Sequence, residues 1–153
     1  MKTAPNIPSR SILPLLGRIF QEMTCRSNQR WNLPPNCCIV LGHLDACPEV
    51  CEPAAVAEAT RLPRQTMTFI LDTLETRGLA VRRPHPRDRR RKTIRLSPAG
   101  RKLARAIRRD FLSVEQAALA GSAGAGLEPA RRHLSRLAEA FARMNRPPPS
   151  SQT

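Results

Sequence analysis

The chain has 153 residues, of which 41% are hydrophobic and 3% aromatic, and it contains no tyrosine. This length predicts one domain, and a core built from aliphatic side chains suits a helical fold better than a large sheet. The formal charge of +14 favours a polyanionic partner, and 13 of the 26 Lys and Arg residues fall between positions 82 and 109, with Asp88 as the single acid there.

The sequence also predicts where the protein resides. No apolar run approaches the roughly 20 residues that span a bilayer, so we expect no membrane segment. Pro5, Pro8 and Arg10 interrupt any apolar core of a signal peptide. We therefore expect a cytoplasmic protein, in whose reducing compartment the five cysteines form no disulfide framework.

The N-terminal third predicts two helices. Residues 1–10 are expected to form a flexible arm, and the apolar positions from Ile12 to Met23 predict a first helix with a wide apolar face. Such a face can serve both the core and a partner subunit. The segment 31–35 ends this helix and begins a second one, because proline is tolerated in a first turn, and the second helix runs to about Asp45.

The middle of the chain predicts a helix-turn-helix. After a connector at 46–49 and a minimal strand at 50–52, a short helix rich in small residues covers 53–60 and a turn covers 60–62. The next helix begins with Pro63 at its first position. Its apolar stripe contains four residues that recur at helical spacing, namely Met67, Ile70, Leu71 and Leu74. Gly78 is expected to end it in the left-handed conformation.

A basic hairpin is predicted next. Residues 79–81 form a short strand, residues 82–92 a loop too highly charged to bury, and residues 93–96 a return strand with Ile94 and Leu96 on one face. Helix, strand, basic loop and strand in this order are the layout of a winged helix-turn-helix.

Two further helices complete the chain. Ser97 is a favourable N-cap, with Pro98 at the first helical position of a long helix. Residues 120–126 predict a flexible break, and the last helix is expected at about 128–144. Residues 145–153, with three consecutive prolines, predict a disordered tail.

The segment LDTLETRGLAVRRPHPRDRRRKTIRLSPAGRKL, residues 71–103, resembles the MarR family of winged-helix transcriptional regulators. Asp88 and Arg90 match the family's Asp-x-Arg wing element, and residues 96–100 match its Leu-Ser-x-x-Gly strand exit. The resemblance implies a mainly α fold with a small antiparallel wing, in one MarR-type domain over 1–153. A helical dimerisation region would cover 11–45 and 97–144, and a DNA-binding lobe 46–96, with flexible ends at 1–10 and 145–153.

The second helix of such a motif lies in the major groove of DNA, where its first residues meet base edges. Arg64 can bind guanine and Gln65 adenine, and Thr66 or Thr68 can contact phosphates or a thymine methyl. Two interpretations of Phe69 stay open: contact with a base methyl or packing against the wing. The expected contact set of this helix is Pro63, Arg64, Gln65, Thr66, Thr68 and Phe69.

The wing supplies the remaining expected contacts. By resemblance, Arg90 enters the minor groove and the Asp88 carboxylate orients its guanidinium, although Asp88 could instead only relieve crowding among the arginines. The other wing cations would bind phosphates and so set affinity and its salt dependence. They are Arg82, Arg83, Arg87, Arg89, Arg91 and Lys92.

The resemblance further implies a homodimer on a pseudo-palindromic operator, most simply a repressor, that responds to a small and often aromatic effector of unknown identity. The candidate pocket residues are Phe20, Trp31, Cys38 and Phe111. No cofactor is expected. The alternatives are a weakly specific DNA-coating or anti-silencing protein without ligand and a cysteine-based redox regulator on the same fold.

The cysteines allow three interpretations. Cys37, Cys38, Cys47 and Cys51 lie close in sequence to His43, and Cys25 lies near the end of the first helix. They can be small buried hydrophobes, a thiol sensor or metal ligands, but no C-x-x-C pair occurs and no metal site is expected. With no phosphate loop and no paired-carboxylate motif, the sequence does not predict an enzyme.

Overall fold

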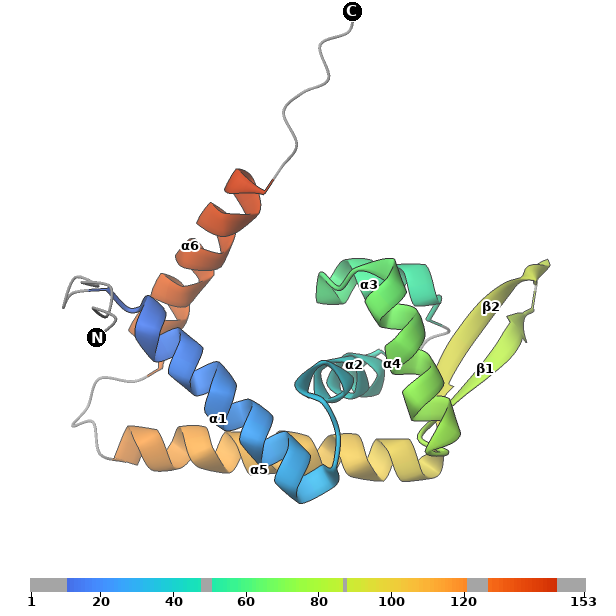
Figure 1. Ribbon diagram of the computed structural model, residues 1–153, viewed down its shortest axis with the longest axis horizontal. Coiled ribbons are helices and arrows are strands. Elements are labelled where there is room, and N and C mark those ends of the chain that lie inside the picture. Colours follow the sequence, from blue (N-terminus) through green and yellow to red (C-terminus); the bar gives the residue numbers. More distant parts are fainter. Residues whose placement is uncertain (1–10, 48–50, 87, 121–126, 146–153) are drawn as a thin grey trace, which may run out of the picture. The chain divides into compact units, whose positions relative to one another are not determined.

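A computed structural model describes residues 11–47, 51–86, 88–120 and 127–145 (Figure 1). The chain divides into two compact units, the first reaching Arg109 and the second beginning at Asp110. The described part of the chain is mainly helical and carries one two-stranded antiparallel sheet. This is the predicted fold class, which is confirmed.

The elements of the first unit follow the order that the sequence predicts. They are α1 (Leu13–Trp31), α2 (Pro35–Ala46), α3 (Pro53–Thr60), α4 (Arg64–Thr76), β1 (Ala80–His85), β2 (Asp88–Leu96) and the first half of α5 (Pro98–Ala120). Three helices begin at a proline, where the missing N–H has no helical partner to lose. Asn32 and Arg61, both in the left-handed conformation, end α1 and α3.

The core of this unit is organised around α4. Its predicted stripe is buried, since Met67, Ile70, Leu71 and Leu74 are each at most 2% exposed. Leu33 and residues of α2 and α3 also belong to this buried core, and Ile94 and Leu96 of β2 point into it as predicted. The opposite face of α4 is exposed. Packing thus fixes which side of the helix faces outward.

A tight junction joins α4, β1 and α5. Gly78 has φ +66°, the predicted left-handed conformation that glycine adopts without strain. The carbonyl of Leu79 accepts a hydrogen bond from the backbone N–H of Ser97, and the Ser97 hydroxyl caps α5 by accepting from Gly100 N at 3.0 Å. A Cβ on Gly100 would lie 1.9 Å from the Leu79 oxygen, so only glycine fits there. This contact explains the glycine of the strand exit.

The hairpin is longer than predicted, and the expected loop over 82–92 is wrong. Both strands continue through this charged stretch, pairing Ala80 with Leu96 and reaching His85 opposite Asp88, with an irregularity between Pro84 and His85. Cross-strand backbone hydrogen bonds form without burial of side chains, so charge alone does not prevent a strand. The expected third strand is reduced to one bridge, Cys51 to Ile94, and Val50 lies outside the described residues.

The second unit contains the end of α5 and α6 (Glu128–Met144), whose bounds match the prediction. No residue of α6 is buried, and Leu134 and Phe141 are 43% and 45% exposed. The predicted break at 121–126, the N-terminal arm and most of the C-terminal tail lie outside the described residues. Among the helices described, none combines the length and apolarity needed to cross a bilayer.

Candidate nucleic-acid interface

The N-terminus of α4 presents polar side chains outward. Pro63 precedes the helix as its N-cap, with ψ 145°, so its predicted place at the first helical position is wrong by one residue. Its carbonyl accepts the first helical hydrogen bond from Met67 N at 2.9 Å. The proline therefore defines where α4 begins without needing a side-chain cap.

The side chains expected to meet base edges are accessible. Arg64, Gln65 and Thr68 are exposed and Thr66 is half-buried. The Thr68 hydroxyl donates to the Arg64 carbonyl at 3.1 Å, so its oxygen can still accept a hydrogen bond. Phe69 is 65% exposed, so the interpretation that it packs against the wing is wrong. An exposed phenyl ring on this face remains available for a base methyl.

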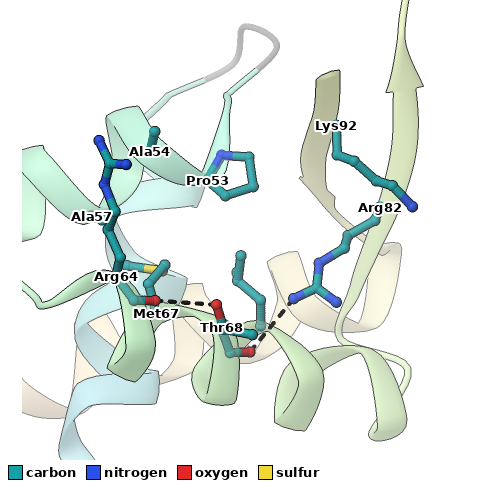
Figure 2. Close-up of a pocket in the computed structure, with 9 residues that line it drawn as sticks. Pro53, Ala54, Ala57, Arg64, Met67, Thr68, Arg82 and Lys92 are labelled. Carbon is teal, nitrogen blue, oxygen red and sulfur yellow. Dashed lines mark hydrogen bonds between the residues drawn. The ribbon is translucent and has the colours of Figure 1, made fainter. Parts of the chain in front are cut away.

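A cleft of about 440 Å³ separates α3 and α4 from the hairpin. Figure 2 shows Arg64 on one side of this cleft and Arg82 and Lys92 on the other, with Pro53 at its α3 wall. Met67 and Leu71 contribute apolar surface to the lining. A second, shallower concavity of about 1000 Å³ lies along α3 and the start of α4, where Arg61, Arg64 and Arg91 line it. Cations thus border both hollows next to the first turn of α4.

Arg82 has a structural role that the sequence interpretation missed. Its Nη1 lies 2.6 Å from Asp72 Oδ1 and 2.7 Å from Glu75 Oε2, and its backbone N–H donates to Glu75 Oε1 at 2.8 Å. The expectation that this guanidinium is free for a phosphate is therefore corrected. Two carboxylates of α4 hold it, and the hairpin base is fixed against the helix.

The wing carboxylate also binds differently than expected. Asp88 Oδ1 accepts a hydrogen bond from the backbone N–H of Arg90 at 2.9 Å, so the contact observed is with the backbone, and the orientation of the Arg90 guanidinium by Asp88 stays a prediction. This bond stabilises the turn of the hairpin, because the Asp88 side chain accepts from the backbone amide of the residue two positions later. Arg90 is exposed. Arg87 and the side chain of Arg89 lie outside the described residues.

The remaining wing cations divide into paired and exposed groups. Arg91 forms an ion pair with Glu52, and His85 Nε2 lies 3.9 Å from the same carboxylate. Arg83 and Lys92 are exposed. Glu52, the residue before α3, therefore links the start of that helix to the hairpin. The accessible wing cations that remain are Arg83, Arg90 and Lys92.

The sequence interpretation missed the acids that position these arginines. Asp72 and Glu75 are three residues apart on α4, a spacing that places both on one helical face, and that pattern was the available signal. Glu52 lies next to the bridge between Cys51 and Ile94, which brings it to β2, and no periodicity in the sequence indicates this.

The four candidate pocket residues have different environments. Phe20 is 52% exposed, Trp31 is half-buried, and Cys38 is buried with its thiol 3.7 Å from Ser27 Oγ. Phe111 belongs to the second unit. The cleft of Figure 2 is lined by other side chains. The assignment of these residues to a ligand pocket stays a prediction.

Two of the five cysteines are buried at the start of α2. Burial raises the pKa of the Cys37 thiol from 9.0 to about 11, with a smaller contribution from Cys38 and an opposing one from Arg77. Burial also raises the pKa of Cys38, while its hydrogen bond with Ser27 opposes this. Both are neutral thiols near pH 7, whereas a sensor requires a thiolate. In the described ranges, no three His, Cys, Asp or Glu side chains converge as metal ligands.

Comparisons with known proteins agree with this architecture. A sequence model of the MarR family matches residues 31–91. The structure of MepR from Staphylococcus aureus in complex with DNA is 24% identical, covers 86% of this chain and 98% of its own, and has a TM-score of 0.75. PcaV from Streptomyces coelicolor, in complex with its natural ligand, is 24% identical, with coverages of 91% and 99% and a TM-score of 0.75.

FabT from Streptococcus pneumoniae, also in complex with DNA, is 16% identical, with coverages of 86% and 93% and a TM-score of 0.73. No curated protein sequence matches the chain. At these identities the solved structures establish the shared fold. Residues 31–91 of this chain match the MarR family, which confirms the family resemblance predicted from the sequence.

Proposed function

We propose that this protein is a transcriptional regulator that binds duplex DNA as a homodimer in the cytoplasm and acts as a repressor. One observation carries the proposal: Arg64 and Gln65 are exposed at the first turn of a helix whose other face is buried, beside a hairpin with exposed cations. A rigid helix end with side chains that can pair with base edges, next to a basic wing, fits the grooves of a duplex. MepR and FabT, which share the fold, were solved with DNA.

The interface divides into two kinds of contact. Arg64 and Gln65 would read bases, and each bidentate contact would supply about 1–3 kcal/mol of discrimination. Arg83, Arg90 and Lys92 would contact the DNA backbone or the minor groove, and each phosphate contact steepens the salt dependence. Arg91 retains a 55% exposed side chain despite its ion pair, so it can still approach a phosphate.

Exposed apolar side chains support the homodimer. Leu15, Ile19 and Phe20 of α1 are each more than 50% exposed, and α6 exposes Leu134 and Phe141. Apolar surface of this extent on two helices favours burial against a second copy. Such a dimer would present two α4 helices, which calls for a pseudo-palindromic operator.

A small-molecule effector belongs to the same proposal. PcaV shares the fold and was solved with its natural ligand, which supports a ligand response of this architecture. In the proposed dimer, each chain contributes one DNA-binding lobe. An effector would release DNA only if it bound more tightly to a dimer whose lobe spacing does not fit the operator than to one whose spacing does.

The first test is retention of sheared genomic DNA on the purified protein at near-physiological salt, followed by sequencing. A few enriched fragments that share an inverted repeat are expected. Broad retention without a shared repeat would contradict the operator-binding proposal and favour a DNA-coating protein.

Two variants then separate the kinds of contact. Gln65→Ala should lose discrimination between the enriched site and a mutated site, while Arg83→Gln should weaken both and reduce the salt slope by about 0.9. Arg132→Gln, an exposed change on α6, removes one charge elsewhere and serves as the matched control. The redox alternative predicts that mild oxidation releases DNA and that a variant with all five cysteines replaced by serine does not respond.

A further inference from the structure

Helix α5 carries a row of cations that the proposed interface does not use. Arg101, Lys102, Arg105, Arg108 and Arg109, together with Pro98, line a groove of about 430 Å³ within the first unit. We refer to this surface as the α5 groove. Arg101, Arg105 and Arg108 follow one another at four and three residues, so they lie on one side of the helix.

The charge in the α5 groove is largely unbalanced. Asp45 of α2 lies 3.6 Å from both Arg105 Nε and Arg108 Nη1, and its side chain is only 7% exposed. The two arginine side chains remain 63% and 59% exposed. Within the described ranges, Asp45 is the single carboxylate that pairs with any of the five cations.

Repulsion between like charges at these spacings destabilises a helix unless an anion neutralises it. Lys102 and Arg109, which are exposed and have no ion-pair partner among the described side chains, are the two cations most available to a ligand. The unbalanced charge therefore favours the binding of an anionic ligand.

The dimensions of the groove indicate an extended polyanion. From residue 101 to 109 the helix advances roughly 12 Å, enough to meet successive phosphates along one strand of a nucleic acid. Long, exposed cations contact phosphates and do not read bases. The lining contains no aromatic side chain, and single-stranded nucleic acids rely on aromatic stacking. Duplex DNA is the form that these observations favour.

The α5 groove is separate from the candidate interface at α4. Its lining shares no residue with the cleft beside the hairpin or with the concavity along α3. Within the first unit, α2 lies between α3 and the basic part of α5 (Figure 1). We propose that the α5 groove binds the phosphate backbone of a second DNA duplex, so that the protein bridges two DNA segments. This inference rests on the proposed DNA binding by α4 and the wing.

Bridging can be measured with the full-length protein. A short duplex that contains the enriched site is fixed on beads, the protein is bound, and capture of a labelled second duplex is recorded. The test variant is K102Q/R109Q, because Arg101 donates to the Leu96 carbonyl and Arg105 and Arg108 pair with Asp45. R132Q/R136Q on α6 removes the same charge and is the control.

The wild type and the control should capture the second duplex, and K102Q/R109Q should lose about tenfold in capture as two phosphate contacts disappear. Its affinity for the first duplex should be unchanged. The salt slope of second-duplex capture should fall by about 1.8.

Several results would overturn the proposal. One is a wild type that binds the first duplex and captures no second one, which leaves the proposed function intact. Another is capture of the second duplex by K102Q/R109Q at the wild-type level. A third is a loss of capture by the R132Q/R136Q control as large as that of K102Q/R109Q. If K102Q/R109Q bound the first duplex more weakly than the wild type, the α5 groove would contact that duplex and not a second one. Binding to phosphatidylglycerol vesicles that K102Q/R109Q abolishes, without second-duplex capture, would assign the groove to a membrane surface. If no duplex binds at all, the proposed function fails as well.

Discussion

Arg77, at the end of α4, donates from Nη1 to the backbone carbonyl of Asn32 at 2.5 Å, across 45 residues of sequence. Its Nη2 donates to the Trp31 carbonyl at 3.1 Å. These two carbonyls lie where α1 ends, and helix ends leave carbonyl groups without helical partners. One guanidinium thus joins the end of α4 to the α1–α2 corner.

Replacing Arg77 by Ala should destabilise the protein by about 1–2 kcal/mol, because two charge-assisted hydrogen bonds to carbonyls are lost. The midpoint of urea unfolding, followed by circular dichroism, measures this. Arg18→Ala, an exposed charge removal on α1, is the control and should leave the midpoint unchanged. Equal midpoints for both variants would show that the Arg77 contacts contribute nothing.

Arg82 and Arg83 are neighbours with opposite expected roles. Arg82→Gln should cost about 1 kcal/mol of stability, because its partly exposed side chain pairs with Asp72 and Glu75. Arg83→Gln should leave the melting temperature unchanged and weaken DNA binding, since its side chain is exposed. Thermal melts and salt-dependent binding of both variants separate the roles. A destabilised Arg83→Gln protein would contradict the assignment.

Two glycines of the α4–β1–α5 junction, with Gly17 of α1 as a reference, provide a graded test of backbone constraint. Gly100→Ala should be the most destabilising, by about 3 kcal/mol, because the added methyl meets the Leu79 carbonyl and the backbone must shift. Gly78→Ala has open space and should cost about 1 kcal/mol through its positive φ alone. Gly17→Ala, in α1 with nothing within 4 Å, should stabilise by roughly 0.5–1 kcal/mol. A different order of melting temperatures would contradict this account.

The buried Cys37 thiol predicts a loss of stability in alkaline solution. Its native pKa of about 11 exceeds the ordinary value of 9.0, so the native state retains its proton over a range in which the unfolded chain releases it. The group has no effect below pH 9, and stability falls as the pH rises from 9 towards 11. The stability difference between the wild type and Cys37→Ala should shrink by on the order of 2 kcal/mol between pH 8 and pH 10.5. A difference that does not vary with pH would show that the native pKa is not raised.

Local sequence patterns predicted most of the fold. The α4 stripe, Gly78 and the Ser97 cap each depend on residues within a few positions of one another, so periodicity and capping preferences identify them. The strand limits could not be predicted in the same way, because backbone pairing carries β1 and β2 through a charged stretch that reads as a loop.

The site was predicted less completely than the fold. The exposure of Arg64 and Gln65 follows from the periodicity of α4, whereas the pairing of Arg82 with Glu75, and of Arg91 with Glu52, depends on how the hairpin packs. The residue types in the sequence identified the cations of the candidate interface. They could not show which of these cations form ion pairs with acidic side chains of the same chain.

Arg61 ends α3 with φ 57°, a conformation that glycine adopts more easily, and its exposed side chain borders the concavity at the start of α4. Holding an arginine in this conformation costs about 1 kcal/mol relative to glycine. A screen that selects only for heat resistance should therefore favour glycine at position 61, and the resulting variants should bind DNA less tightly. Under the proposed function, thermal tolerance and affinity for DNA would therefore place opposite demands on this one residue.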